Sequence, residues 1–295
     1  MRYKETKGEK AFHVINAVVL AVLTFAFFYP VWFCLVSSFS DPQRLIGHKG
    51  AMLVPLGFSL AGYDAVLHNK NILIGYANTL FYVGMGTAIG FLLTLLGAYF
   101  MSRKSMMLKK PLTFVVILTM YVSAGLIPHF LLVRSLGLYD TRWAVILPSV
   151  INTYNMIVMR TAIMALPDSL EESAMLDGAG ELTILFRIIL PLIKATVAVI
   201  ILFFAVAWWN AWFNAAIYIR DRSKYPLQLF LREILIASTT DGNDGAPATS
   251  DQGVYYLEAV IKYSAIIIST VPILCAYPFV QKYFVQGMML GSLKG

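Results

Sequence analysis

The chain reads Glu172-Ser-Ala-Met-Leu-Asp-Gly178 and, after nine further residues, Ile188-Ile-Leu-Pro191. This polar stretch lies between two segments that are apolar enough to span a bilayer. Its acidic residues, central glycine and closing proline predict a short helix, a turn and a second short helix. Such a structured polar segment between membrane spans predicts a binding site for a soluble partner. The alternative is an ordinary loop whose acidic residues only keep it soluble.

Local signals predict where the two short helices begin and end. Pro167 suits the first turn of a helix, and Ser169 with Glu172 has the spacing of a capping box. Gly178 can take the left-handed conformation that ends a helix. A second helix is expected over about Glu181–Ile189, ending at Pro191.

Composition and hydropathy predict an all-α integral membrane protein. Hydrophobic residues make up 59% of the 295 residues and charged residues 13%, against about 25% charged in soluble domains. A membrane-spanning helix needs roughly 20 mostly apolar residues. Six segments qualify, namely about Val14–Ser37, Leu73–Met101, Leu112–Val133, Trp143–Met159, Leu192–Ile219 and Tyr263–Phe284.

The short loops predict the orientation of these spans. Arg103, Lys104, Lys109 and Lys110 share one loop that holds no acid, which is typical of a cytoplasmic loop. The expected organisation is a cytoplasmic tail at 1–13, a six-span domain at 14–285 and a cytoplasmic tail at 286–295. Within the domain, residues 166–190 are expected in the cytoplasm and residues 220–262 outside.

The sequence carries no motif for catalysis. It has no G-x-x-x-x-G-K-[ST] loop for nucleotide phosphates, no nucleophile with a general base, and no His/Cys cluster for a metal. Cys34 and Cys275 are expected to be buried thiols. The net charge of +7 comes from basic residues beside apolar segments. This placement excludes the stripe of basic and aromatic residues that would indicate nucleic-acid binding. The span interiors also lack the charged side chains typical of ion-driven transporters, so we expect the driving force to come from a source other than an ion gradient.

Aromatic and amide side chains gather in the outer half of the fifth span. Trp208 with Trp212, and Asn210 with Asn214, have i, i+4 spacing and would share helix faces. Indole faces and amides suit carbohydrate rings and hydroxyls. The alternative is an aromatic belt with interhelical amide hydrogen bonds. The candidate pathway residues are Asn152, Asn155, Trp208, Trp209, Asn210, Trp212 and Asn214.

Residues 238–253 have no periodicity and are rich in turn formers, which predicts an exposed loop. The segment just before it, Leu227–Ile236, is expected to be a short amphipathic helix. The loop is either a slack connector or a contact for an external protein. The candidate contact residues are Thr239, Asp241, Asn243, Asp244 and Asp251.

The pattern E-[AS]-A, three residues, G, nine residues, I-x-L-P resembles the motif by which membrane subunits of bacterial binding-protein-dependent ABC importers dock their ATPases. More of the chain resembles the oligosaccharide branch of that family, in particular the smaller maltose-type membrane subunit and permeases for complex oligosaccharides. These further matches are Ser123–Pro128, Leu136–Leu138, Trp208–Trp212, Tyr225–Leu229, Leu231–Leu235 and Gly291–Gly295.

The resemblance implies a type I importer fold in the bacterial plasma membrane. It implies a second homologous permease subunit, two ATPase subunits that bind ATP and Mg, and an external sugar-binding protein, with no cofactor on this chain. The 238–253 loop would lie where the maltose-type subunit enters the binding protein's cleft. The implied docking residues are Glu171, Glu172, Ser173, Ala174, Asp177 and Gly178.

Two other functions stay open from the sequence. The docking pattern alone also fits an importer of a non-sugar solute, such as amino acids or phosphate. A membrane scaffold or channel that works without nucleotide is the second alternative.

Overall fold

The computed structural model describes residues 6–48, 50–103, 107–240, 260–275 and 277–278. Within these ranges every regular element is a helix, and the one extended pairing is a bridge between Ser40 and Phe58. The prediction of an all-α chain is confirmed for this part of the molecule. The chain forms two compact units, Met1–Asn69 with Glu233–Val271 and Lys70–Arg232 with Pro272–Gly295.

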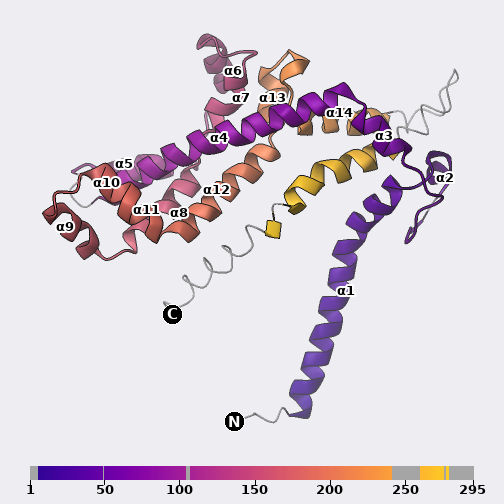
Figure 1. Cartoon of the computed structure of the whole chain (residues 1–295), viewed down its shortest axis with the longest axis horizontal. Coiled ribbons are helices and arrows are strands. Elements are labelled where there is room, and N and C mark those ends of the chain that lie inside the picture. Colours follow the sequence, from indigo (N-terminus) through magenta and orange to yellow (C-terminus); the bar gives the residue numbers. More distant parts are fainter. Residues whose placement is uncertain (1–5, 49, 104–106, 241–259, 276, 279–295) are drawn as a thin grey trace. The chain divides into compact units, whose positions relative to one another are not determined.

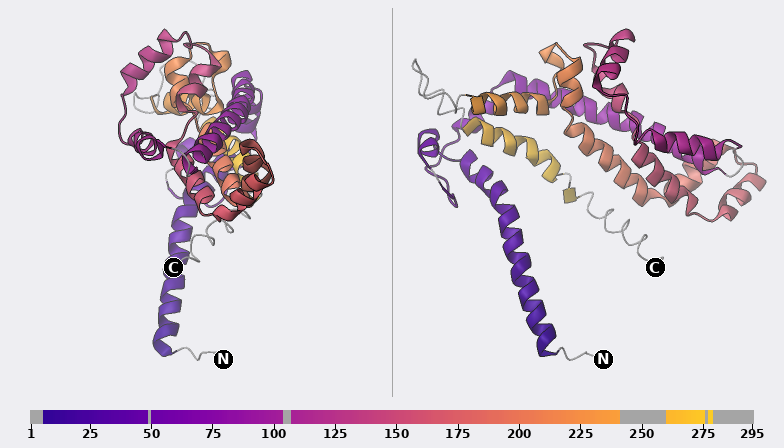
Figure 2. Two further views of the ribbon diagram at one scale, coloured as in Figure 1. Left: turned by 90° about the vertical axis from the view of Figure 1, so that its left-hand side faces the viewer. Right: turned by 180° about the vertical axis from the view of Figure 1, so that it is seen from behind.

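The first unit contains α1 (Lys7–Ser38), α2 (Pro42–Gly47), α3 (Ala61–Leu67), the later part of α14 (Leu227–Thr240) from Glu233, and the helix Val260–Cys275 as far as Val271. A capping box of Thr6 and Glu9 starts α1, which then runs as one long helix (Figure 2). Apolar side chains along α1, such as Val14 and Phe25, are exposed, as expected for a helix that meets lipid. A small core of Val36, Leu45, Met52 and Val260 holds the unit together.

The second unit is built around α4 (Lys70–Ser102). Two of its glycines let other elements approach closely: a Cβ on Gly86 would lie 2.4 Å from the Trp208 indole, and one on Gly90 would lie 2.8 Å from both Phe204 and the Val150 carbonyl. Figures 1 and 2 show α12 (Lys194–Trp209) running beside α4. The remaining elements of the unit are α5 (Lys109–Leu118), α6 (Leu126–Ser135), α7 (Arg142–Ile146), a 3-10 turn at Leu147–Ser149, α8 (Thr153–Met164), α9 (Asp168–Leu176), α10 (Glu181–Thr183), a π-helical turn at Ile184–Ile189, α11 (Leu190–Leu192), α13 (Phe213–Tyr218), a 3-10 turn at Arg222–Lys224 and the start of α14 (Leu227–Thr240).

Polar side chains tie the beginning of α4 to the segment between α13 and α14. Asn78 donates to the carbonyls of Ser223 and Tyr225 at 2.7 and 3.0 Å. Tyr82 donates to the Lys224 carbonyl at 2.8 Å. The Thr79 hydroxyl accepts the Leu227 N–H at 2.9 Å, in a fully buried contact. Because these bonds satisfy backbone groups of an irregular segment, they fix its position on α4.

Two of the predicted spans are continuous helices. Among the described residues, α1 and α4 are long and apolar enough to cross a bilayer, and the bent pair Glu181–Leu192 and Lys194–Trp209 makes a third if counted as one. The predicted sixth span begins as the helix Val260–Cys275, and most of its remainder lies outside the described residues. The predicted amphipathic helix at Leu227–Ile236 is confirmed as the start of α14.

The three middle spans are interrupted, where the sequence led us to expect unbroken helices. The third breaks between α5 and α6 at residues 119–125, where Gly125 has φ +83°. The fourth breaks between α7 and α8, where a 3-10 turn at Leu147–Ser149 contains Pro148. The fifth breaks between α12 and α13 at residues 210–212. Non-helical backbone at membrane depth is tolerated where protein or a cavity surrounds it.

The entry to α12 also differs from the prediction. The second helix of the 166–190 segment runs on past Pro191 to Leu192, and the chain then turns by 90° into α12. Pro191 has no N–H to continue an α-helical ladder, and the turn before it is widened into a π-helix.

Candidate functional sites

The 166–190 segment contains a helix that ends in a tight turn at Gly178, as predicted. At its end, Gly178 has φ +78° and its N–H donates to the Met175 carbonyl at 3.0 Å. The Ala179 N–H donates to the Ala174 carbonyl at 2.9 Å. This pair of bonds is a Schellman motif, which satisfies the last carbonyls of α9. The helix α9 thus ends at Gly178, as the sequence predicted.

The start of α9 differs from the prediction. Pro167 is the N-cap residue, the helix begins at Asp168, and no side chain caps it. The predicted capping box of Ser169 and Glu172 is therefore wrong, because both residues already lie inside the helix. The negative charge of Asp168 still lies in the first turn, where it complements the helix dipole.

The six docking residues expected from the resemblance do not share one environment. Glu172, Ser173, Asp177 and Gly178 are exposed. Ala174 is 7% exposed and belongs to the core that includes Ile184 and Leu185 of the following turn. The small side chain thus allows close packing inside the segment itself, where we had expected it against a partner. The carboxylate of the sixth residue, Glu171, also bonds within the chain.

Two exposed leucines flank the turn, and neither was among the predicted docking residues. Leu176 is 89% exposed and Leu182 is 64% exposed. Large apolar side chains exposed on a polar segment are typical of protein contacts. Their place directly around Gly178 could have been noticed in the sequence, since apolar residues beside a helix-ending glycine either pack back or meet a partner.

Arg103, at the end of α4, holds the 166–190 segment through two carboxylates. Its Nη1 pairs with Glu171 of α9, and its Nη2 lies 2.6 Å from Oε1 of Glu181 in α10. The guanidinium also stacks over the Tyr99 ring at 5.2 Å, and the Tyr99 hydroxyl donates to Glu181. The Arg103 side chain is only 12% exposed. In the sequence, Arg103 indicated only the orientation of its loop.

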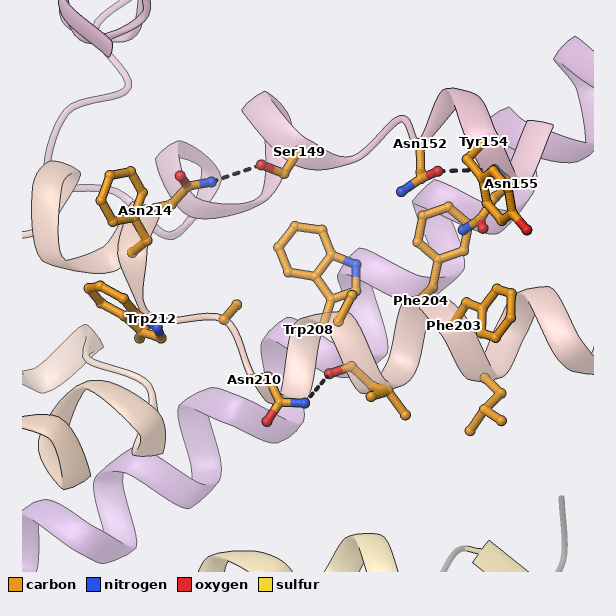
Figure 3. A pocket seen from close by; sticks show the side chains of 15 residues that line it. Ser149, Asn152, Tyr154, Asn155, Phe203, Phe204, Trp208, Asn210, Trp212 and Asn214 are labelled. Atoms are coloured by element: carbon orange, nitrogen blue, oxygen red, sulfur yellow. Dashed lines mark hydrogen bonds between the residues drawn. The ribbon is translucent and has the colours of Figure 1, made fainter. Parts of the chain in front are cut away.

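A cavity of about 780 Å³ lies between α8, α12 and α13 (Figure 3). The structure brings six of the seven predicted pathway residues to its lining. They are Asn152, Asn155, Trp208, Asn210, Trp212 and Asn214. Ser149, Tyr154, Phe203 and Phe204 line it as well and were not predicted, because only the fold brings α8 and its preceding turn against α12.

The i, i+4 reasoning that grouped these residues was wrong. The chain leaves the helix at Asn210, and Trp212 and Asn214 belong to the next element. Trp209 is not among the described residues that line the cavity, and its ring contacts Tyr76 of α4, with ring centroids 6.2 Å apart. Trp212 lines the cavity and is covered on its ring by Arg232, whose Cζ lies 3.5 Å from the ring centroid.

The cavity amides are held by the protein in fixed orientations. Asn152 caps α8, its Oδ1 accepting the Asn155 N–H at 3.0 Å (Figure 3). Asn214 donates to the Ser149 hydroxyl at 2.9 Å, and Asn210 donates to the Val206 carbonyl at 2.9 Å. Within the described part of the chain, the side-chain oxygens of Asn210 and Asn214 have no hydrogen-bond donor. Fixed amide oxygens beside aromatic rings suit a ligand rich in hydroxyl groups.

The predicted external contact residues are largely beyond the structure. Asp241, Asn243, Asp244 and Asp251 lie outside the described residues. The backbone of Thr239 belongs to the last turn of α14.

The sequence matches the family described as binding-protein-dependent transport system inner membrane component over residues 54–290. It is 40% identical to the polygalacturonan/rhamnogalacturonan transport system permease protein YtcP of Bacillus subtilis (strain 168), over 88% of this chain and 90% of that one. It is 37% identical to protein LplC of the same organism, over 98% and 97% of the two chains.

The fold matches a chain in the crystal structure of a bacterial ABC transporter involved in the import of the acidic polysaccharide alginate. The TM-score is 0.86 with 29% identity, and the match covers 96% of this chain and 99% of that one. Together with the match to the family over most of its length, these likenesses show that the chain belongs to the inner-membrane permease subunits of binding-protein-dependent ABC transport systems.

Proposed function

We propose that this chain is one of two homologous membrane subunits of an ATP-driven importer of oligosaccharides or polysaccharide fragments. It crosses the membrane six times with both termini in the cytoplasm, through a domain at 14–285 between tails at 1–13 and 286–295. ATP and Mg bind to two separate ATPase subunits. An external sugar-binding protein delivers the substrate, and residues 220–262 face it.

The structure of the 166–190 segment is the observation that carries this proposal. A helix closed by a Schellman motif presents Glu172, Ser173, Asp177 and Gly178 at its surface, with Leu176 and Leu182 exposed beside them. This combination of exposed charge and exposed leucine suits a cleft on a soluble protein. We assign the ATPase as that protein, because the family's docking motif lies on the same residues.

The cavity supports a sugar as the solute. Its lining combines indole rings with oriented amide oxygens, which bind the apolar faces and the hydroxyl groups of a sugar ring. Of the similar proteins, YtcP is described as a permease for polygalacturonan or rhamnogalacturonan, and the solved transporter is involved in the import of alginate; all of these solutes are polysaccharides.

Docking is tested by placing a charge on the exposed leucine of the turn. Because Leu176 is 89% exposed, Leu176→Glu leaves the fold intact and reduces co-purification of the ATPase and ATP-driven sugar uptake by tenfold or more. Glu172→Lys acts in the same direction. The matched control is Leu136→Glu, since Leu136 is also an exposed leucine at a helix end. Equal recovery of the ATPase with Leu176→Glu, Glu172→Lys and the control would overturn the assignment.

A further inference from the structure

Arg103 joins three parts of the second unit in one cluster. It follows the last residue of α4, and its guanidinium faces Glu171 from α9 and Glu181 from α10. The ring of Tyr99, one turn earlier in α4, stacks on the guanidinium, and its hydroxyl donates a hydrogen bond to Glu181. One cation therefore bridges the two helices of the 166–190 segment across the turn at Gly178 and attaches both to α4.

This bridge is partly shielded from water. The Arg103 side chain is 12% exposed and that of Glu171 is 29% exposed, whereas that of Glu181 is 59% exposed. Ionic hydrogen bonds with little access to water resist screening and fix geometry, because the guanidinium holds its donors in a rigid plane. A neutral side chain at position 103 would leave two carboxylates facing each other with no cation between them.

The end of α4 is itself fixed to its neighbours. Arg160 of α8 donates to the Met101 carbonyl at 3.1 Å, and Lys109 of α5 donates to the Ser102 carbonyl at 3.1 Å. Cations on the last carbonyls of a helix complement its dipole and satisfy its free acceptors. A displacement of the 166–190 segment thus acts on the end of α4 and cannot be absorbed by fraying of its last turn.

The helix α4 also packs against α12, and this contact positions side chains that line the cavity. From Arg103 to Gly86 is seventeen residues, or about 25 Å of α-helix. Gly86 lies against Trp208 and Gly90 against Phe204, and both of these aromatic side chains line the cavity. A shift of α4 along or about its axis therefore moves the surface against which two lining residues are packed.

We propose that Arg103 is a positioning residue that couples movement of the 166–190 segment to α4, and through α4 to the cavity. This inference rests on the proposed docking of the ATPase on that segment. Arg103 itself contacts neither the substrate nor nucleotide. Its effect is to keep α9, α10 and the end of α4 as one body, so that a force applied at the docking surface reaches the transmembrane helix.

The test uses the complete transporter with its partner subunits in proteoliposomes. Arg103→Gln should keep the ATPase bound and its hydrolysis rate within about twofold, while the sugar taken up per ATP hydrolysed falls by tenfold or more. Arg103→Lys should recover part of the loss, because an ammonium group can pair with one carboxylate but cannot bridge both in the same geometry. Arg134→Gln is the matched control, since Arg134 is an exposed arginine in the last turn of α6.

A double-mutant cycle separates coupling from a general loss of stability. If the bridge carries the coupling, Glu181→Gln in the Arg103→Gln background causes little further loss of uptake per ATP. Glu181→Gln alone, at a half-exposed side chain, preserves the fold and provides the test if Arg103→Gln does not insert. Unchanged uptake per ATP in Arg103→Gln and Glu181→Gln would overturn the inference, as would additive losses in the double variant.

The outcome also distinguishes this inference from the proposed function. Retention of the ATPase by Leu176→Glu would refute the docking surface, regardless of the uptake per ATP measured for Arg103→Gln. Release of the ATPase by Arg103→Gln, with the fold intact, would make Arg103 a docking determinant and would overturn the coupling role.

Discussion

Alanine at Gly86 is predicted to push α4 and α12 apart. Gly86 faces the indole of Trp208, and a Cβ built there would lie 2.4 Å from Cε2 and 2.6 Å from both Cδ2 and Nε1. Favourable carbon–carbon contacts begin at about 3.5 Å. The indole or the helices must therefore move by about 1 Å to relieve the clash, and Trp208 is packed so closely that it is only 4% exposed.

Gly84 provides a matched control for this clash. It lies in the same helix two residues earlier, and a Cβ there meets nothing within 4 Å. Both variants gain the same helix propensity, about 1 kcal/mol for glycine to alanine, so their difference isolates the overpacking. Inserting a methyl group into a packed site costs about 1–3 kcal/mol. Gly86→Ala should thus unfold below Gly84→Ala by roughly 2–4 °C for each kcal/mol.

The assay is thermal unfolding of the purified complex in one detergent, followed by tryptophan fluorescence, with sugar uptake measured in parallel. Gly86→Ala should also reduce uptake, because the displaced indole lines the cavity. Trp208→Leu in the Gly86→Ala background removes the clashing ring and should recover part of the lost stability. Identical unfolding temperatures for Gly86→Ala and Gly84→Ala would refute the close α4–α12 contact.

Two further predictions concern the polar contacts of the second unit. Thr79→Val removes the acceptor of the buried Leu227 N–H and should destabilise the protein by about 1–3 kcal/mol. Thr87→Val, at a buried hydroxyl that has no partner among the described residues, should be neutral or stabilising, and equal thermal shifts of the two variants would contradict this. Asp140 has φ 59° and accepts the N–H groups of Arg220 and Asp221, so Asp140→Asn should be milder than Asp140→Ala in thermal unfolding. The hydrogen bond from the Asp221 N–H is the main cause that lowers the pKa of Asp140. The greater stability of the wild type over Asp140→Asn should therefore be present at neutral pH and disappear as the pH falls through that lowered pKa. A stability difference that does not depend on pH would refute this prediction.

Features set by a few neighbouring residues could be predicted from the sequence. Gly178 ended α9 as expected, because a residue without Cβ is favoured at φ +78° and the bonds it forms are local. The capping box failed for an equally local reason. Ser169 and Glu172 have the right spacing, but Pro167 is the N-cap and the helix already begins at Asp168, one residue before Ser169.

Features set by distant residues could not be predicted. The residues Trp208-Trp-Asn-Ala-Trp212 contain no glycine or proline, yet the helix ends there. Three of the pathway residues nevertheless reach the cavity from the interruption and from α13, because the break turns them toward it. The bridge of Arg103 joins residues 68 and 78 positions away in the sequence, and a single sequence carries no signal for such a pairing.

The α4–α12 interface combines close packing with unsatisfied polar groups. Within the described residues, the indole N–H groups of Trp208 and Trp209 are buried and have no acceptor. A buried donor without a partner costs about 1–3 kcal/mol, and the cost is not recovered in an apolar membrane interior. This cost applies to the contact between α4, which Arg103 holds, and α12, which lines the cavity. Gly86 and Gly90 allow the two helices to approach closely there. An interface that is tightly packed but incompletely hydrogen-bonded loses less on separation than a fully paired one. If the cavity is part of the transport pathway, as we propose, an interface of this kind suits a wall that opens and closes in each cycle.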